Sequence, residues 1–512
     1  MPRFNLRRLL FDRDTLSLMG LGLMVKPVGL VTQMLIAKWF GAGEKLDAYQ
    51  LAFFLVTFGH GTLSRIFKGA LAPHLIQKMR TLESAVFARY QNGVVGLFLG
   101  AGALWIVLLT LSVRPLIGVV WPGLPELTSQ LTVQMQLAMA VPAVLLISNN
   151  LTIAVLNLHQ HFRVAGAMPV LNSVCVLGAL VLWHDSMGIW SLPAGFALAQ
   201  VVRWPVIHLR ALICRAWRPV RPSLNGADMR LIRELVALMA ISELLLTVNL
   251  FLDRWFATGL EAGSISSLHY AFHLTNTVVV LFATSLITVM FPRMSAAIAA
   301  GDLEGCSRDI RANLKRAAHI VVPAAVMVAV AAPEIVYVLF QRGEFDATDG
   351  LRTSGTMAMY ALGLPALVIN GLVARVFHSL QLLRDKVWLS VQYLATNALL
   401  NAALIGPLKV RGLALASTVA IVVHLALSLY LLHRRHTGLA TGQFTRIVSE
   451  AFLIGGLTMG VYWLLPVAET LARFTDPSIW TALGLGIAKG AVVAVIYVVF
   501  WFILWAIGRS RR

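Results

Sequence analysis

The stretch MVKPVGLVTQ, Met24 to Gln33, places a lysine and a proline in the middle of an apolar run. LSLMGLGLMV leads into Lys26 and VGLVTQMLIA follows Pro27, so the run is long enough to cross a bilayer as a helix. A charge at that depth is costly, and we expect Lys26 to line a water-filled cavity and meet an anion. Proline removes a backbone hydrogen bond, so Pro27 and Gly29 predict a bend that makes this helix a gate element.

The composition predicts a membrane protein. Of the 512 residues, 58% are hydrophobic and only 13% are charged, about half the charge of a soluble domain. The net charge of +19 arises from small clusters between apolar segments, which is typical of topogenic loops and excludes a nucleic-acid partner. Three scattered cysteines, Cys175, Cys214 and Cys306, predict neither a disulfide framework nor a metal site.

The fold class that we expect is an all-α polytopic membrane protein with about fourteen transmembrane helices, at about 20 apolar residues per crossing. With the N-terminus inside, 27 of the 42 basic residues fall in cytoplasmic loops or tails and 8 in the opposite loops, so both termini are predicted to be cytoplasmic. We expect the helices near residues 15–38, 47–72, 86–112, 131–157, 164–184, 188–211, 230–256, 266–292, 314–340, 355–380, 387–406, 411–433, 447–467 and 478–507.

The two halves of the chain echo each other in the same orientation. WFGAGEKLDAYQLAF (39–53) follows the first predicted helix, and WFATGLEAGSISSLHYAF (255–272) follows the seventh. This similarity predicts a parallel repeat, in which two lobes rock about a central cavity. We expect an N-lobe of six helices at 1–212, a cytoplasmic loop at 213–229, a C-lobe of six helices at 230–436, and two additional helices at 437–512.

The second predicted helix carries a polar stripe. His60, Ser64 and Lys68 recur at intervals of four residues, with Arg65 beside them, which predicts that this face lines a cavity. The alternative is that Arg65 and Lys68 anchor the cytoplasmic end of the helix. His269 and His273 recur at the same interval on the eighth helix.

Other charges within the predicted helices have simpler interpretations. Arg203, Arg375 and Lys489 lie near helix ends, where snorkelling is expected. The carboxylates that we place inside helices are Glu243 and Asp253, so the cavity is predicted to be positive and to take an anion. Either carboxylate is also an alternative partner for Lys26, and Asp253 is an alternative structural partner for Arg254.

Motifs of nucleotide-binding loops, hydrolases and metalloproteases are absent from the sequence, so we expect a transporter and not an enzyme, with no cofactor. Membrane potential and a monovalent ion both stay open as energy sources.

Three motifs, FGAGEKLDAY (40–49), LFQRGEFDATD (339–349) and IGPLKVRGLALA (405–416), make the chain resemble the MurJ/MviN lipid II flippase family of the multidrug/oligosaccharidyl-lipid/polysaccharide exporter superfamily. The resemblance implies a flippase in the bacterial inner membrane. Its cargo would be an undecaprenyl-diphosphate-linked glycan, moved by alternating access. A groove for the lipid tail at the last two helices, and membrane lipids and cell-wall or polysaccharide synthesis enzymes as partners, are implied as well.

The resemblance also assigns roles to particular residues. Where the family has two arginines in the first helix, this chain has Lys26 and Thr32, and His273 stands where the family has a charged residue in the eighth helix. We expect the diphosphate to contact Lys26, Arg65 and Lys68, with His273, Arg254 and His60 as further contacts, and Asp47 to form part of an external gate.

Three other functions stay open. An exopolysaccharide or O-antigen repeat unit is an alternative cargo for a flippase with these cations. A cation-coupled small-molecule antiporter of the same fold would need Glu243 or Asp253. A membrane scaffold that recruits biosynthetic enzymes would not need the cavity charges.

Overall fold

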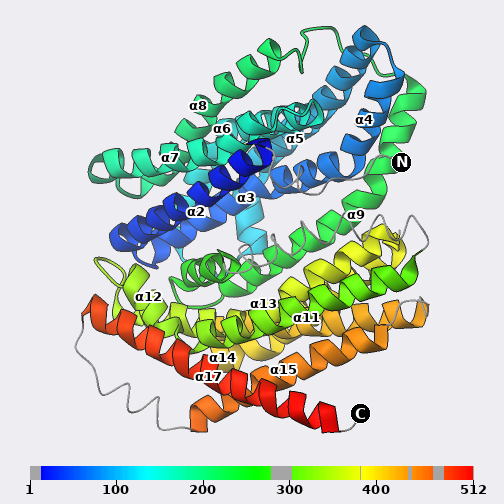
Figure 1. The fold of residues 1–512 in the computed structure, drawn as a ribbon. Helices are drawn as coiled ribbons and strands as arrows, with labels where there is room; N and C mark the ends of the chain where they lie inside the picture. Colours follow the sequence, from blue (N-terminus) through cyan, green and yellow to red (C-terminus); the bar gives the residue numbers. More distant parts are fainter. Residues whose placement is uncertain (1–12, 278–301, 381, 436–440, 465–477, 511–512) are drawn as a thin grey trace. The chain divides into compact units, whose positions relative to one another are not determined.

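The computed structural model describes residues 13–277, 302–380, 382–435, 441–464 and 478–510 (Figure 1). Within these ranges the regular structure is helical, without a strand, and nine segments are long and apolar enough to cross a membrane. The chain forms two compact units, residues 1–247 (unit 1) and 248–512 (unit 2), and the division falls inside helix α9.

Unit 1 is built from long helices of about the expected bounds. α3 packs against α6, α2 against α7, and α8 against both α6 and α7. The helices are α2 (Arg13–Phe40), α3 (Glu44–Ile66), η1 (Phe67–Leu71), α4 (Ala72–Thr81), α5 (Ser84–Val120), α6 (Glu126–Leu158), α7 (Phe162–Met187), η2 (Gly188–Trp190), α8 (Ser191–Ile213) and the first part of α9 (Gly226–Ala257).

The segment between α8 and α9 is fastened to α5. Asn92 donates from Nδ2 to the carbonyl oxygens of Arg218 (2.8 Å) and Val220 (2.9 Å), and Gln91 donates to that of Ala216 (2.9 Å). Amide side chains therefore satisfy carbonyls that no regular element would pair. This loop belongs to the 213–229 segment that we expect to separate the lobes, and that division stays a prediction.

In unit 2, α13 packs against α11 and α14, and α17 packs against α11, α12 and α15 (Figure 1). The expected helix at 266–292 is described only up to residue 277. The helices are the last part of α9, a helix at 264–277, α11 (Leu303–Val330), α12 (Ala332–Phe340), α13 (Ala347–Ser379), α14 (Leu383–Arg435), α15 (Thr441–Leu464) and α17 (Ile479–Ser510).

The two helices expected at 387–406 and 411–433 meet within α14. The backbone leaves helical geometry at Lys409 (φ 50°, ψ −133°), two residues after Pro407. Gly412 follows this kink, and a Cβ there would collide with the carbonyl of Leu404, so the tight turn requires a glycine. The kink brings Lys409 and Arg411 to one end of unit 2.

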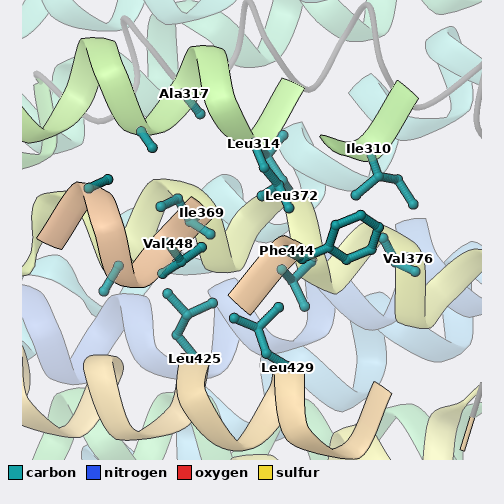
Figure 2. Close-up of a cluster of buried hydrophobic side chains, with 14 of the residues drawn as sticks. Ile310, Leu314, Ala317, Ile369, Leu372, Val376, Leu425, Leu429, Phe444 and Val448 are labelled. Carbon is teal, nitrogen blue, oxygen red and sulfur yellow. The ribbon is translucent and has the colours of Figure 1, made fainter. Parts of the chain in front are cut away.

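A buried apolar cluster, part of which Figure 2 shows, joins five helices of unit 2: α11, α13, α14, α15 and α17. Leu314 of α11, Ile369 of α13, Leu429 of α14 and Phe444 of α15 are each at most 3% exposed. Inside a bilayer such helices associate through close packing, because lipid is as apolar as leucine. The cluster therefore joins these helices into one well-packed body.

Candidate functional site

Helix α2 carries Lys26 as a half-buried side chain, and the helix continues through Pro27 without interruption. Within the described residues Lys26 has neither a hydrogen bond nor an ion pair from its ammonium group. Pro27 is exposed, and the space beside Gly29 is open. Thr32 is buried and its Oγ1 donates to the Val28 carbonyl (2.8 Å), so its hydroxyl is used within the helix.

The polar stripe of the second predicted helix crosses a change in helix type. α3 ends at Ile66, and a π-helical turn, η1, follows directly and contains Lys68. A π-turn inserts an extra residue per turn and is frequent at functional sites. It also changes the register, so the four-residue spacing of His60, Ser64 and Lys68 does not by itself place them on one face. Lys68 is exposed and, in the described part of the chain, has no ion-pair partner.

Arg65 joins α3 to the part of α9 that belongs to unit 1. Its Nε lies 2.5 Å from Glu243 Oε2, and its Nη2 donates to Thr247 Oγ1 at 2.9 Å. Thr247 in turn lies 3.0 Å from Thr62 Oγ1. The Arg65 side chain is still 45% exposed, whereas Glu243 is 12% exposed. Glu243, an alternative partner for Lys26, is therefore bound to Arg65.

His60 lies one helical turn before Ser64 and contacts α6. Its Nε2 lies 2.7 Å from Asn150 Nδ2, which also donates to the Leu146 carbonyl (2.9 Å). Asn150 thus donates to both groups, and Nε2 accepts. This arrangement fixes His60 as a hydrogen-bond acceptor on the interior side of α3.

Asp253 of unit 2 is held by neutral donors. It is 7% exposed, and its oxygens accept from Asn397 (2.8 Å), Asn401 (2.9 Å) and Ser417 (3.2 Å). Asn397 also donates to Asn249. A buried carboxylate is costly without such bonds, so this network keeps the carboxylate in the helix bundle. The spacing of Asn397 and Asn401 by four residues in an apolar helix was the signal available in the sequence.

Arg254 and His273 are both half-buried in unit 2. The rings of His269 and His273 lie 6.2 Å apart, as expected for neighbours on one helix face. Asp47, in the first turn of α3, is only 4% exposed. The structure thus gathers Arg65, Glu243 and Thr247 in unit 1, and it leaves the proposed roles of Arg254, His273 and Asp47 as predictions.

Two cations expected to snorkel are instead buried among polar partners. Arg203 is 5% exposed, and its Nη1 donates to Gln200 Oε1 (3.0 Å) and Asn172 Oδ1 (3.2 Å). Lys489 of α17 donates to Glu334 of α12 at 2.5 Å, with side chains 14% and 10% exposed. Snorkelling was the wrong expectation for both, because each cation bonds inside the bundle to a side chain of a neighbouring helix, Arg203 to Asn172 and Lys489 to Glu334.

The same contact corrects the count of acidic residues inside helices. Glu334 lies within the predicted helix 314–340, so Glu243 and Asp253 are an incomplete set of the carboxylates inside helices. Its charge is matched by Lys489, so it does not alter the balance of the cations in unit 1. Snorkelling of Arg375 stays a prediction.

The comparisons with known proteins agree with this architecture. The family profile described as "Lipid II flippase MurJ" matches residues 36–478. The chain belongs to the lipid II flippase MurJ family. The "Probable lipid II flippase MurJ" of Vibrio cholerae is 25% identical over 470 residues, 88% of each chain, and the "Lipid II flippase MurJ" of Burkholderia cenocepacia is 24% identical over 527 residues, 97% of each.

Solved structures establish the fold. A "Lipid II flippase MurJ, inward closed conformation" matches with a TM-score of 0.78 at 18% identity, covering 96% of this chain and 98% of that one. An inward-facing multidrug resistance MATE family transporter of the MOP superfamily matches with a TM-score of 0.66 at 14% identity, covering 83% and 98%. The protein is therefore an all-α, multi-span membrane protein with the MurJ fold.

Proposed function

We propose that this protein is a flippase that moves a polyprenyl-diphosphate-linked saccharide, lipid II or a lipid II-like precursor, from the inner to the outer leaflet by alternating access. It resides in the bacterial inner membrane with both termini in the cytoplasm, and it acts without enzymatic chemistry. Membership of the MurJ family over residues 36–478 supports this function. Substrate-synthesising enzymes are its proposed partners.

The observation that carries the proposal is a set of cations in unit 1 whose charge is incompletely balanced. Within the described residues neither Lys26 nor Lys68 has an acidic partner, although both belong to helices of a membrane protein. An uncompensated cation in such a helix is expensive unless it faces water or an anion. A diphosphate supplies the opposite charge, and Arg65 adds a guanidinium that can bind two phosphate oxygens at once.

Because Arg65 is paired with Glu243, cargo binding to Arg65 would weaken the contact between α3 and α9. A phosphate that bonds to Arg65 competes with Glu243 for the same guanidinium, and the two anions repel each other. Loss of this ion pair loosens the contact of α3 with α9, and α9 continues into unit 2. Cargo binding is thereby linked to the one helix that both units share.

The test measures flipping of labelled lipid II by purified protein in proteoliposomes. Lys26→Ala, Arg65→Ala and Lys68→Ala should each reduce the initial rate at least tenfold at matched protein content. Arg80→Ala is the control, because Arg80 is an exposed basic residue of α4 outside this set. Equal rates in all four variants would exclude a role for these cations and favour a scaffold.

The cargo is resolved by a parallel assay with an undecaprenyl-diphosphate-linked exopolysaccharide or O-antigen repeat unit. We expect lipid II to be flipped faster, since the matched family is the lipid II flippase family. If only the repeat unit were flipped, the proposed diphosphate site would still stand, and the cargo would be the repeat unit and not lipid II. Export of a small molecule that needs Asp253 and no lipid would instead establish the antiporter.

A further inference from the structure

A basic pocket of unit 2 is lined by residues of that unit alone. The pocket has a volume of about 370 Å³. Its walls come from the loop after α9, the first turns of α13 and the kink of α14, and they include Glu261, Arg352, Lys409 and Arg411. Three cations thus share a small concave site with one carboxylate.

Acceptors within the protein bind only some of the hydrogen-bond donors of these three cations. Glu261 accepts from Lys409 Nζ and lies 3.4 Å from Arg352 Nη2. Arg352 also donates to the Ala262 carbonyl at 2.7 Å. Arg411 donates from Nη2 to the Leu351 carbonyl at 3.2 Å, and within the described residues no carboxylate pairs with it. The lining therefore keeps an excess of positive charge.

The backbone is specialised to hold this arrangement. Lys409 has a positive φ of 50°, which a residue with a Cβ adopts only at a cost, and such residues gather at binding sites. Arg411 lies against Gly355 of α13, where a Cβ would collide with its Nε. The space that Gly355 of α13 leaves for Arg411 and the strained kink in α14 together position the Lys409 and Arg411 side chains.

The location makes this charge unusual. The sequence assigns eight basic residues to outer loops, and three of them, Arg352, Lys409 and Arg411, line this pocket. Basic residues are depleted from that side of an inner-membrane protein, so their gathering in one pocket calls for a local partner. Acidic neighbours in the α12–α13 loop do not line it, and Asp346 instead caps α13 by accepting from the Asp349 backbone nitrogen at 2.8 Å.

We propose that this pocket binds a phosphate group, with Arg411 and Arg352 as the principal ligands and Lys409 shared between Glu261 and the anion. Guanidinium groups match the geometry of phosphate oxygens, and the pocket is large enough for a phosphate with part of a headgroup. Binding would tie together the loop after α9, α13 and α14. The phosphate belongs either to a lipid headgroup of the outer leaflet or to a free phosphate ion.

Substitutions of Glu261 and of Arg411 are expected to change phosphate binding in opposite directions. The hydrogen bond and charge of Lys409 hold the pKa of Glu261 below its usual value, so this carboxylate is ionised at neutral pH and competes with the ligand. Removing its charge in Glu261→Gln should strengthen phosphate binding severalfold. Removing a cation in Arg411→Gln should weaken binding at least tenfold. A purely structural role for the cluster predicts no such opposed changes.

The experiment is equilibrium dialysis of radiolabelled inorganic phosphate against the full-length protein in maltoside micelles, which contain no phosphate. Arg114→Gln is the control, because Arg114 is an exposed basic residue of unit 1 also assigned to an outer loop. Arg411→Lys keeps the charge and reports whether a loss of binding reflects misfolding. The measurement is repeated in an Arg65→Gln background, so that phosphate bound by Arg65 of unit 1 does not count.

Competition by short-chain phosphatidylglycerol identifies the source. Tighter binding of this lipid than of phosphate assigns the site to a headgroup, and binding of phosphate alone assigns it to the free ion. The proposal is overturned if neither probe binds, or if Arg411→Gln and Glu261→Gln bind as the parent does. Because the readout is binding in an Arg65→Gln background, a failed flippase assay would leave this result unaffected.

Discussion

Arg65 Nε lies 2.5 Å from Glu243 Oε2, so one ion pair connects α3 to the first part of α9. The Arg65 side chain is 45% exposed and Glu243 is 12% exposed, so the pair is accessible from the arginine side. Nη2 is bound to Thr247, which leaves other guanidinium donors for an incoming ligand. The arginine is thus held in place before any cargo arrives.

Removing the carboxylate should therefore strengthen phosphate binding while weakening the fold. For Glu243→Gln we expect a stability loss of about 1 kcal/mol, because the arginine is half in solvent. That corresponds to a decrease in Tm of about 2–4 °C. Differential scanning fluorimetry measures it, with Glu234→Gln, an exposed glutamate on the same helix, as the control. An unchanged Tm together with unchanged affinity for inorganic diphosphate would refute the coupling.

Lys26 should tolerate arginine better than any neutral residue. A guanidinium retains the charge and adds bidentate contacts to phosphate oxygens. We expect Lys26→Arg to flip at the parental rate or faster, and Lys26→Met, which keeps the length without the charge, to lose at least tenfold. Initial rates in proteoliposomes measure this. Equal rates for the two variants would show that the charge of Lys26 does not act on the cargo.

The sequence predicted those features that depend on apolar length and on charge density. It identified the all-α membrane fold and the approximate bounds of most of the described helices. It did not predict the π-turn at Phe67–Leu71, because the neighbouring turns determine helix type and the composition of FKGAL does not. Nor did it predict that Glu243 would bind Arg65, since these residues are 178 positions apart and only the packed structure brings them together.

The burial of Arg203 and Lys489 was not predicted for the same reason, because it depends on contacts between residues far apart in the sequence. Arg203 and Lys489 lie near helix ends in sequence, where snorkelling is the ordinary expectation. Their partners, Asn172 and Glu334, come from other helices and could be assigned only after packing was known. Polar residues within apolar helices were the available signal, although that signal does not identify the partner.

Asp253→Asn should destabilise unit 2. The substitution keeps the shape, but one of its two acceptor oxygens becomes a donor facing Asn397, Asn401 or Ser417. An unsatisfied buried polar group costs about 1–3 kcal/mol, so we expect Tm to fall by several degrees. Thermal unfolding in micelles is the readout. If Tm were unchanged while flipping was lost, the carboxylate would act in transport and not in holding the helices together.

The stabilisation from the Glu261–Lys409 pair should depend on pH. The pKa of Glu261 is lowered in the folded protein, chiefly by Lys409, so its contribution is present above the unfolded value of about 4.3 and is lost as pH falls through the folded value. Comparing Tm of the parent and Glu261→Gln between pH 3 and 7 should show a difference that disappears at the acidic end. A constant difference would indicate that the carboxylate does not titrate with the pair.

The Glu334–Lys489 pair should be much more important for stability than exposed ion pairs, because both side chains lie inside the contact of α12 with α17. Lys489 binds Oε1 of Glu334, and the buried Oε2 accepts no hydrogen bond from the described residues, so Lys489→Met leaves an uncompensated carboxylate. Breaking such a pair costs about 3–5 kcal/mol, whereas replacing both partners by apolar residues is often neutral. We therefore expect Lys489→Met to lower Tm strongly and the double variant Lys489→Met/Glu334→Leu to recover most of the loss. A double variant as unstable as the sum of its single variants would show that the two residues do not interact.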